Sequence, residues 1–385
     1  MGGLVFASTP LASGKPPHVP RMSPEVYRKV SAECKLKLGT LFNNVVVPRD
    51  APGKADYGDV DFLVEGIASD TWPREIWFKT KELLDAALHL PRGGSHSFAI
   101  LHPDIPEAYV QVDVELSPGN GTPGATELFK WTAFMKGDGD LLQIIGITHR
   151  YLGLTCNDKG LHFRVKDIHT DNKKKQLLFL TRDPDEAMKF HGLDVAKYHE
   201  GFADENELFD WVTNGRFFSA SIFADRTEKS NDRSRQKKRS MYAQFIEVYM
   251  PLHAGKGTST EWTQQVVLDE ALAAFDKRAG YEAMVAEHNA IKDEEQLWNK
   301  IRAVLPVEGN PLKLALRGLR RWVVFEDGEP RITEEPMLED HPAWTASMAF
   351  GSIEKLLCWV TDNWEAIKAL EKARVMVVKE AMATG

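Results

Sequence analysis

Alternating hydrophobic and polar positions mark short strands in the first half of the chain. In GDVDFLV (58–64), Val60 and Phe62 point to one side of an extended backbone and two aspartates point to the other, because strand side chains alternate between faces. The stretch AYVQVDVEL (108–116) alternates in the same way, with valines on one face and polar residues on the other. Both stretches are typical of strands that are buried on one face.

Helical patterns flank these strands. A helix is predicted to begin after Ser23, a good N-cap, with Pro24 at its first position. A second helix is predicted over 74–88, and further strands over 43–49 and 97–103. The order helix, strand, strand, helix, strand, strand predicts an α+β sheet domain whose sheet is covered on one side.

The chain is predicted to fall into four parts. A Pro/Gly/Ser-rich flexible tail (1–22) precedes the sheet domain (23–166). An α+β or helical segment (167–255) follows, and a helical C-terminal domain (256–385) carries long helical periodicity with a short β piece near its middle.

Composition narrows the class of protein. The 385 residues are 43% hydrophobic and 27% charged, as in ordinary globular proteins. The net charge of -8 argues against coating nucleic acid through bulk electrostatics, although a local basic groove stays compatible with it. Three widely spaced cysteines, no apolar run of membrane-spanning length and no secretory signal pattern predict an intracellular protein, cytoplasmic or nuclear, without a membrane partner.

Three aspartates carry the candidate chemistry. Asp59 and Asp61 share one face of their strand, and Asp113 projects from the second polar-faced strand. Like charges held side by side repel, and a hard cation that takes oxygen ligands compensates for this. A lone Asp-x-Asp is common in solvated turns, but three carboxylates on two strands predict a site for Mg²⁺ or Mn²⁺ that activates a hydroxyl and neutralises a triphosphate.

These motifs resemble a known superfamily. YGDVDFLV followed by VQVDVEL is similar to the palm of DNA polymerase beta-like nucleotidyltransferases. Family X DNA polymerases then carry an aromatic pair followed by Thr-Gly or Ser-Gly, then a helix and a Gly-Leu-x-Leu-Asn hairpin. Here Trp131-Thr132, a helix over 140–151 and GLTCNDKGL (153–161) follow in that order, and TRDPDEAMKFHGLD (181–194) is similar to the family's acidic helix. The resemblance covers residues 37–197.

The resemblance implies a fold and an activity. The fold would be a nucleotidyltransferase palm with a mixed sheet, a thumb-like segment over 167–255 and a mostly helical C-terminal region. The enzyme would transfer a nucleoside monophosphate from an NTP or dNTP to an acceptor hydroxyl, such as a nucleic-acid 3'-OH, with release of pyrophosphate. Asp59 and Asp61 would bridge the metals, and Asp113 would hold the catalytic one. Nucleotidylation of a protein or small molecule, or a catalytically retired palm that binds nucleic acid, are the alternatives.

The predicted nucleotide-binding residues follow the family less closely. The family's Gly-Ser at a helix N-terminus has its nearest counterpart in Gly39-Thr40, about twenty residues before Asp59. Arg49 or Lys54 are candidates to hold the phosphates instead, and templated DNA synthesis is not implied. The predicted set is completed by Gly58, Trp131 and Thr132, of which Trp131 fits either stacking on a base or packing in the core.

Other polar residues have competing interpretations. Asp138 and Asp140 in KGDGD fit a solvated turn with an N-cap, or a fourth carboxylate site. Glu115 shares the face of Asp113 and is expected in a salt bridge at the rim, with a place beside the metal as the alternative. His96 and His102 have no third ligand at useful spacing, which favours a structural role.

Two groups of basic residues are candidates for binding nucleic acid. The first precedes an amphipathic helix and comprises Arg233, Arg235, Lys237, Lys238 and Arg239. It fits a solvated helix, an RNA or DNA contact, or a nuclear-localisation signal. The second lies on a predicted helix and comprises Arg317, Arg320 and Arg321. The sequence gives no indication of oligomeric state.

Overall fold

The computed structural model describes residues 5–68, 75–170, 172–226, 228–337, 343–348 and 353–384. The chain divides into two compact units, 1–278 and 279–385. The first unit is mixed α+β and the second is mostly helical, which confirms the predicted fold class. The boundaries predicted at 22, 166 and 255 all lie inside the first unit.

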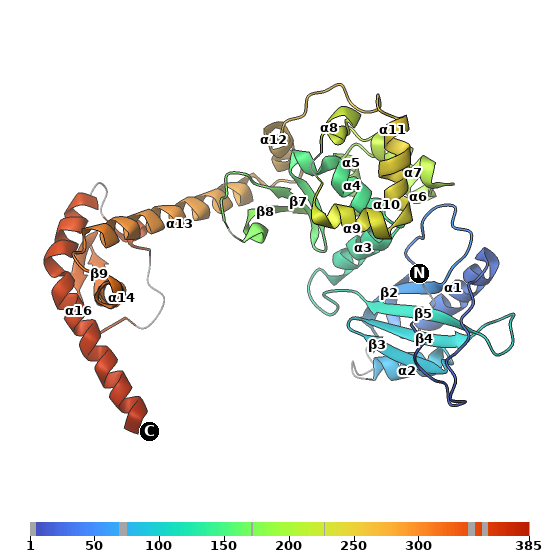
Figure 1. Cartoon of the computed structure of the whole chain (residues 1–385), viewed down its shortest axis with the longest axis horizontal. Helices are drawn as coiled ribbons and strands as arrows, with labels where there is room; N and C mark the ends of the chain where they lie inside the picture. Colours follow the sequence, from blue (N-terminus) through green and yellow to red (C-terminus); the bar gives the residue numbers. More distant parts are fainter. Residues whose placement is uncertain are drawn as a thin grey trace. The chain divides into compact units, whose positions relative to one another are not determined.

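A five-stranded mixed sheet opens the first unit (Figure 1), in the order β1-β2-β5-β4-β3. Its strands are β1 (Phe42–Val46), β2 (Asp59–Ile67), β3 (Leu88–Arg92), β4 (Ser95–Leu101) and β5 (Tyr109–Leu116). β2 and β5 are parallel neighbours, and the other pairs are antiparallel. The two strands that carry the aspartates therefore lie side by side.

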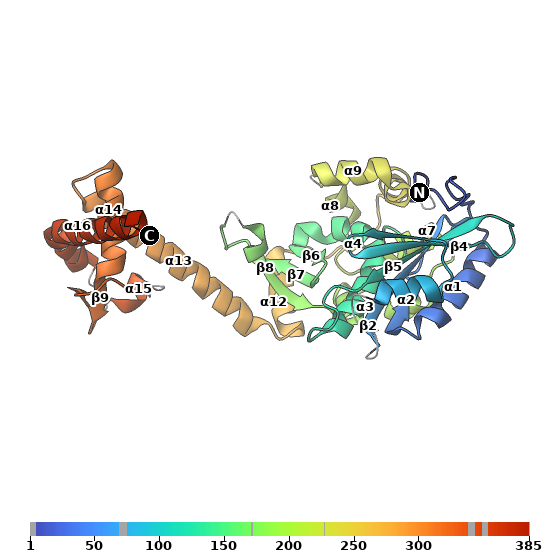
Figure 2. The same ribbon diagram turned by 90° about the horizontal axis from the view of Figure 1, so that it is seen from below.

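Helices α1 (Pro24–Leu38) and α2 (Ile76–Leu83) pack on one face of this sheet, as both Figure 1 and Figure 2 show. Ser23 caps α1 by accepting from Val26 N–H, as predicted. Val60 and Phe62 of β2 lie in the core beneath the helices. Because burial of each such side chain is worth roughly 1.5–3 kcal/mol, this apolar face fixes which side of β2 and β5 is left for polar residues.

Two parts of this region differ from the prediction. The helix predicted over 74–88 ends at Leu83, because Asp85 takes a left-handed backbone (φ 52°), and Leu88 begins β3. The segment predicted as a flexible tail lies against the sheet domain. Phe6 is completely buried, and Met22 exchanges backbone hydrogen bonds with Tyr57.

The rest of the first unit surrounds a smaller sheet. The order helix, then hairpin is confirmed by α4 (Leu141–His149) and the strands β6 (Leu154–Asn157) and β7 (Gly160–Arg164), to which β8 (Leu177–Thr181) adds a third strand. The helices and helical turns of this part are α3 (Ala125–Lys136), η1 (Arg150–Leu152), η2 (Lys173–Gln176), α5 (Pro184–Phe190), α6 (Val195–Glu200), α7 (Glu205–Thr213), α8 (Ala220–Ala224), α9 (Ser230–Lys238), α10 (Ser240–Gln244), η3 (Phe245–Tyr249), α11 (Met250–Leu252) and α12 (Gln264–Ala274).

A buried histidine pair lies in this helical part. His149 and His191 meet edge to face, with ring centroids 4.8 Å apart, and both side chains are almost fully buried. Burial lowers the pKa of His191 to about 4 and that of His149 well below its usual range. Both rings are therefore neutral in the folded protein at neutral pH.

We expect the first unit to lose stability as the pH falls from about 6.5 toward 4. The unfolded chain protonates these histidines below about 6.5 and the folded chain does not, so each costs up to about 1.4 kcal/mol per pH unit in this window. Calorimetry at pH 7 and pH 5 should show a smaller decline for His191→Asn than for the parent. His169→Asn, at an exposed histidine, should match the parent, and an unchanged decline in His191→Asn would contradict the prediction.

The second unit is built on three long helices. Its elements are α13 (Arg278–Val304), α14 (Gly309–Trp322), β9 (Val323–Glu326), β10 (Glu329–Ile332), α15 (Trp344–Ser347) and α16 (Ile353–Thr384). The β9–β10 hairpin is the short β piece expected from the sequence. α14 packs closely on α16, since a Cβ added at Gly318 would lie 2.9 Å from Ile367 O. In the described part of the chain, no helix combines the length and apolarity needed to cross a membrane.

Candidate carboxylate site

β2 and β5 place the three predicted aspartates on one face of the sheet. Asp61 is in register with Asp113, and Asp59 is in register with Gln111. Because paired residues of neighbouring strands point to the same face, the three carboxyl groups lie on the side opposite α1 and α2. The alternation that buries Val60 and Phe62 is therefore also what gathers the carboxylates.

The rim of this face carries two lysines. Lys136, at the end of α3, forms a 2.8 Å salt bridge with Glu115, which confirms the predicted rim pair. Lys54, in the loop before β2, pairs with Asp50 and lies 4.7 Å from the centre of the Tyr57 ring. The positive charges of Lys54 and Lys136 act on Asp59 and Asp61 respectively.

The pKa values of Asp59 and Asp61 are raised above the usual range of an aspartate. Desolvation by the surrounding protein and repulsion from Asp59 and Asp113 raise the pKa of Asp61 to about 7. Desolvation and repulsion from Asp113 also raise the pKa of Asp59. The Asp61 side chain is exposed at the surface of the sheet, so water moderates both the desolvation and the repulsion.

Asp113 is the buried member of the group. Its Oδ2 accepts a 2.9 Å hydrogen bond from Gln111 Nε2, whereas Oδ1 is buried without a hydrogen-bond partner. Ser97, its register partner on β4, is also buried with an unpartnered Oγ. An unpartnered buried carboxylate oxygen costs free energy unless something binds it.

The donor set fits a hard divalent cation. Carboxylate oxygens are the ligands that Mg²⁺ and Mn²⁺ prefer, and Asp113 Oδ1 is an orphaned acceptor among them. Within the ranges that the structure describes, no three His, Cys, Asp or Glu side chains already form a closed ligand group. The aspartates are neighbours on one face by register, but as placed they do not form a ligand group.

Gly39 and Thr40 do not have the geometry of a phosphate site. Gly39 is the C-cap of α1, and Thr40 Oγ1 donates to Lys37 O, so carbonyl groups rather than N–H groups converge there. β1 starts directly after them and pairs with the far end of β2, where Phe42 lies opposite Ile67. They therefore lie near the end of the sheet away from Asp59.

Arg49, Lys54 and Gly58 lie in or next to the loop that leads into β2. Arg49 donates to Asp138 Oδ2 at 2.7 Å and to Tyr198 O at 2.5 Å, so its guanidinium has partners already. Arg49 and Lys54 line one cavity of about 460 Å³, together with the exposed Arg28. Gly58 is buried directly before Asp59.

Trp131 and Thr132 belong to the core rather than to an open surface. Trp131 is completely buried, and its Nε1 donates to Asn157 O at 2.7 Å. Thr132 beside it is buried as well. The turn before α4 is formed by residues 137–140 instead. Of the two interpretations of Trp131, the structure supports core packing.

Asp138 and Asp140 occupy a turn, but not the solvated one expected. Both side chains are buried; Asp138 binds Arg49, and Asp140 binds Arg239 at 2.6 Å. Neither joins a group of three potential metal ligands among the described residues. They tie the α3–α4 turn to distant segments.

His96 and His102 have structural partners. His96 stacks on Trp77 with ring centroids 3.7 Å apart and shares a hydrogen bond with His89. His102 Nδ1 accepts from two backbone N–H groups of the following turn. The structural role favoured for both residues is consistent with these contacts.

The basic cluster lies on α9 and the residue after it. It comprises Arg233, Arg235, Lys237, Lys238 and Arg239. Arg235 pairs with Asp232 within α9 at 3.2 Å, and Arg239 pairs with Asp140 of the α3–α4 turn. The other three form no ion pair with any described residue and are the ones open to a nucleic-acid phosphate.

Sequence comparison places the chain in no family: no family model matches it, and no curated protein matches it significantly. Solved structures do match. One is the crystal structure of Leishmania infantum polymerase beta in a ternary P/T complex, at 14% identity and a TM-score of 0.32, covering 46% of this chain and 75% of that chain. The likeness is distant, so a proposed chemistry depends on this chain's own residues.

Three residues of the site escaped the sequence-based prediction. Gln111 donates a hydrogen bond to Asp113, and Ser97 is its register partner on the neighbouring strand β4. Lys136 of α3 forms the salt bridge at the rim. A signal existed for Gln111, two residues before Asp113 on the same strand face. The other two are placed by strand order and helix packing, which local patterns do not encode.

Proposed function

We propose that the protein is a metal-dependent nucleotidyltransferase that joins a nucleoside monophosphate to an acceptor hydroxyl and releases pyrophosphate. One observation carries the proposal. Asp59, Asp61 and Asp113 share a sheet face, repel one another, and include a buried oxygen with no partner. Three carboxylates kept together against repulsion suit a site that a cation completes.

In this proposal three aspartates are the metal ligands, and a neighbouring glutamine orients one of them. Asp59 and Asp61 present their oxygens from β2, and Asp113 presents Oδ1 while Gln111 fixes its other oxygen. Bound Mg²⁺ or Mn²⁺ would neutralise the triphosphate and lower the pKa of the attacking hydroxyl. Asp113, while holding that cation, would help the hydroxyl lose its proton.

The phosphates would lie against the loop before β2. The positive charge of Lys54 lowers the pKa of Asp59, and Lys54 lines the 460 Å³ cavity with Arg49 and Arg28. Gly39-Thr40 has no part in this arrangement. Arg49 is engaged with Asp138 and Lys54 with Asp50, so either residue would share its donors with a phosphate. We assign the first phosphate contact to Lys54 because its charge acts on Asp59.

The acceptor that we favour is a nucleic-acid 3'-OH. The unpaired part of the basic cluster, Arg233, Lys237 and Lys238, belongs to the same unit as the carboxylates and supplies phosphate contacts of the kind that position a strand. Transfer to a protein or metabolite would use the same metal chemistry, and the assay below distinguishes these acceptors from a nucleic-acid strand.

A transfer assay tests the proposal directly. The full chain is incubated with Mg²⁺ or Mn²⁺, each labelled NTP and dNTP in turn, and RNA and DNA primers. We expect metal-dependent extension of a primer that is lost in the Asp59→Ala/Asp61→Ala double variant, because that variant removes two of the three carboxylates.

The distribution of the label decides among the alternatives. Label on the protein itself or on a small molecule would replace the nucleic-acid acceptor while keeping the reaction. No transfer by the parent under any condition, together with metal-independent oligonucleotide binding, would indicate a retired palm and would remove the proposal.

A further inference from the structure

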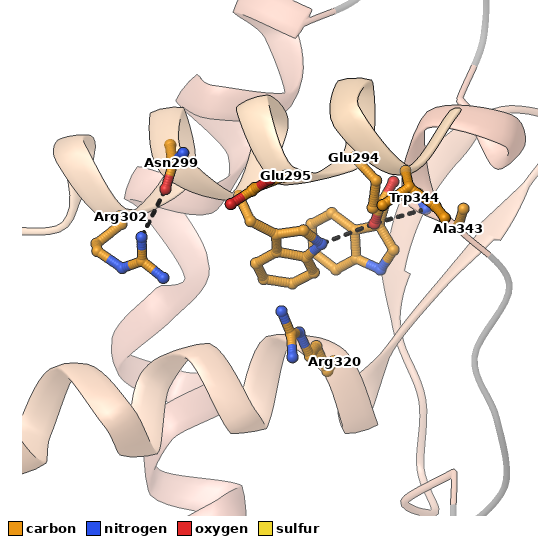
Figure 3. Close-up of a pocket in the computed structure, with 9 residues that line it drawn as sticks. Glu294, Glu295, Asn299, Arg302, Arg320, Ala343 and Trp344 are labelled. Carbon is orange, nitrogen blue, oxygen red and sulfur yellow. Dashed lines mark hydrogen bonds between the residues drawn. The ribbon is translucent and has the colours of Figure 1, made fainter. Parts of the chain in front are cut away.

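A cavity in the second unit gathers aromatic and positively charged side chains (Figure 3). It has a volume of about 550 Å³ and lies between α13, α14 and the start of α15. Trp298 and Trp344 form its aromatic wall, with ring centroids 4.7 Å apart. Arg302 and Arg320 reach it from two different helices. The volume is within the range usual for small-ligand sites.

Glu294 lines the cavity but has no capacity left for a ligand. Its two carboxylate oxygens accept four hydrogen bonds, from Trp298 Nε1 at 2.7 Å, Trp344 N–H at 3.1 Å, and the N–H and hydroxyl of Thr345 at 2.9 Å. This carboxylate anchors residues 344–345 to α13. The indole of Trp298 is thereby held in a fixed orientation.

The two arginines have spare donors. Arg320 lies over the Trp298 ring at 4.5 Å and forms no ion pair with the described residues. Arg302 donates to Asn299 Oδ1 at 2.7 Å and likewise has no acidic partner among them. Figure 3 shows both guanidinium groups turned toward the same space below α13. The lining carboxylates are Glu294 and Glu295, so the formal charges of the lining balance, but no described acidic side chain forms an ion pair with either arginine.

Neighbouring arginines on α14 show that Arg320 is a special case. Arg321 and Arg317 lie 3.3 and 3.9 Å from Glu371 of α16, so both have an ion-pair partner on the neighbouring helix. Arg320 instead lies on an indole, where a guanidinium stacks well and keeps its in-plane N–H donors free. The ion pairs with Glu371 thus account for two arginines of α14 and not for the third.

We propose that this cavity binds a nucleotide, recognising a planar base together with its phosphate. The guanidinium plane of Arg320 offers a stacking surface for the base, supported from behind by Trp298. Arg302 and the free edge of Arg320 match the bidentate geometry of a phosphate. The ligand is either a free nucleotide or the terminal nucleotide of a strand, since the two share this chemistry.

This site is separate from the proposed transfer reaction. It lies in the second unit and uses no carboxylate of the β2–β5 face. Binding is therefore expected without a divalent cation. Measurement in EDTA with the Asp59→Ala/Asp61→Ala double variant as background makes failure of this site distinguishable from failure of the catalytic proposal.

The test is a titration of the full-length double variant, labelled with ¹⁵N on its tryptophan indoles, in EDTA. AMP, GMP, CMP, UMP, adenosine and a 5'-phosphorylated tetranucleotide are the probes. We expect phosphorylated probes to shift the indole signal of Trp298, which is assigned with Trp298→Phe. Arg320→Gln should weaken binding by about tenfold or more, because it removes charge-assisted hydrogen bonds and the stacking plane. Lys313→Gln removes an exposed charge from the same helix and should leave the affinity unchanged.

The outcomes are decisive in each arm. Equal affinity for a mononucleotide and the tetranucleotide would identify a free-nucleotide site, and tighter binding of the tetranucleotide would identify a strand end. The proposal fails if adenosine binds as tightly as AMP, if no probe shifts the Trp298 signal, or if Lys313→Gln weakens binding as much as Arg320→Gln.

Discussion

Replacing Asp113 by asparagine is expected to abolish nucleotidyl transfer while leaving the folded protein at least as stable as the parent. The change keeps the shape of the side chain and removes one of three charges that repel one another. Loss of the carboxylate assigned to the catalytic cation and to the proton of the hydroxyl should reduce the rate by about 10³-fold or more, or about 4 kcal/mol of transition-state stabilisation.

Stability and activity must be measured together for this variant. The rate is followed under single-turnover conditions with Mg²⁺, and thermal unfolding is followed without it. We expect an unfolding temperature of the first unit equal to or above that of the parent, because Asp113 Oδ1 is a buried carboxyl oxygen without a partner. A purely structural Asp113 would give the opposite pattern, with lower stability and retained turnover.

Glu115→Gln is the matched control. Glu115 lies two residues along the same strand and on the same face, but it pairs with Lys136 at the rim. Its replacement should change the rate by much less than that of Asp113. If both variants lost activity equally, general electrostatics of the sheet face would explain the loss, and the specific role of Asp113 would be withdrawn.

The carboxylate face was predictable because it depends on local alternation. Asp59 and Asp61 share a side of β2 whatever strand lies beside them, and the apolar residues between them decide which side is buried. The register of β2 with β5 joins residues more than fifty positions apart. That pairing brings Asp113 beside Asp61. The strand pattern in the sequence is compatible with this neighbour relation but does not determine it.

Long-range ion pairs account for the error at KGDGD. KGDGD reads as a solvated turn, yet Asp138 and Asp140 are buried by Arg49 and Arg239, which are 89 and 99 positions away. The residues around Trp131 in the sequence do not indicate that its side chain is buried. In the structure its indole N–H donates to Asn157 O. Turn chemistry predicts where the backbone bends, and tertiary packing decides whether water reaches it.

Glu371 shows the same limit in the second unit. In the sequence it is one charge in the helical stretch IKALEKARV, a pattern typical of a solvated face. In the structure its side chain is completely buried between α14 and α16. Arg321 and Arg374 donate to its oxygens at 2.9–3.3 Å, and Trp322 Nε1 donates at 3.3 Å.

Replacing Glu371 by alanine is therefore expected to destabilise the second unit strongly. The change leaves partly buried arginines without a counterion and opens a cavity beside Gly318, where α14 packs closely on α16. Breaking a buried pair by removing one partner costs about 3–5 kcal/mol, and we expect about 3 because Arg321 and Arg374 retain some contact with water. Lys372→Ala, at the exposed neighbouring position, should cost little.

Hydrogen exchange followed by mass spectrometry isolates this effect, because a chain of two units does not unfold in one step. A loss of about 3 kcal/mol corresponds to roughly 150-fold faster exchange in peptides from α14 and α16, while peptides from β5 report on the first unit and should be unchanged. Protection of α14 equal to that of the parent would mean that the apolar contacts of α14 with α16 hold the helices by themselves. In that case the arginines around Glu371 would be compensating for a buried charge rather than joining the two helices.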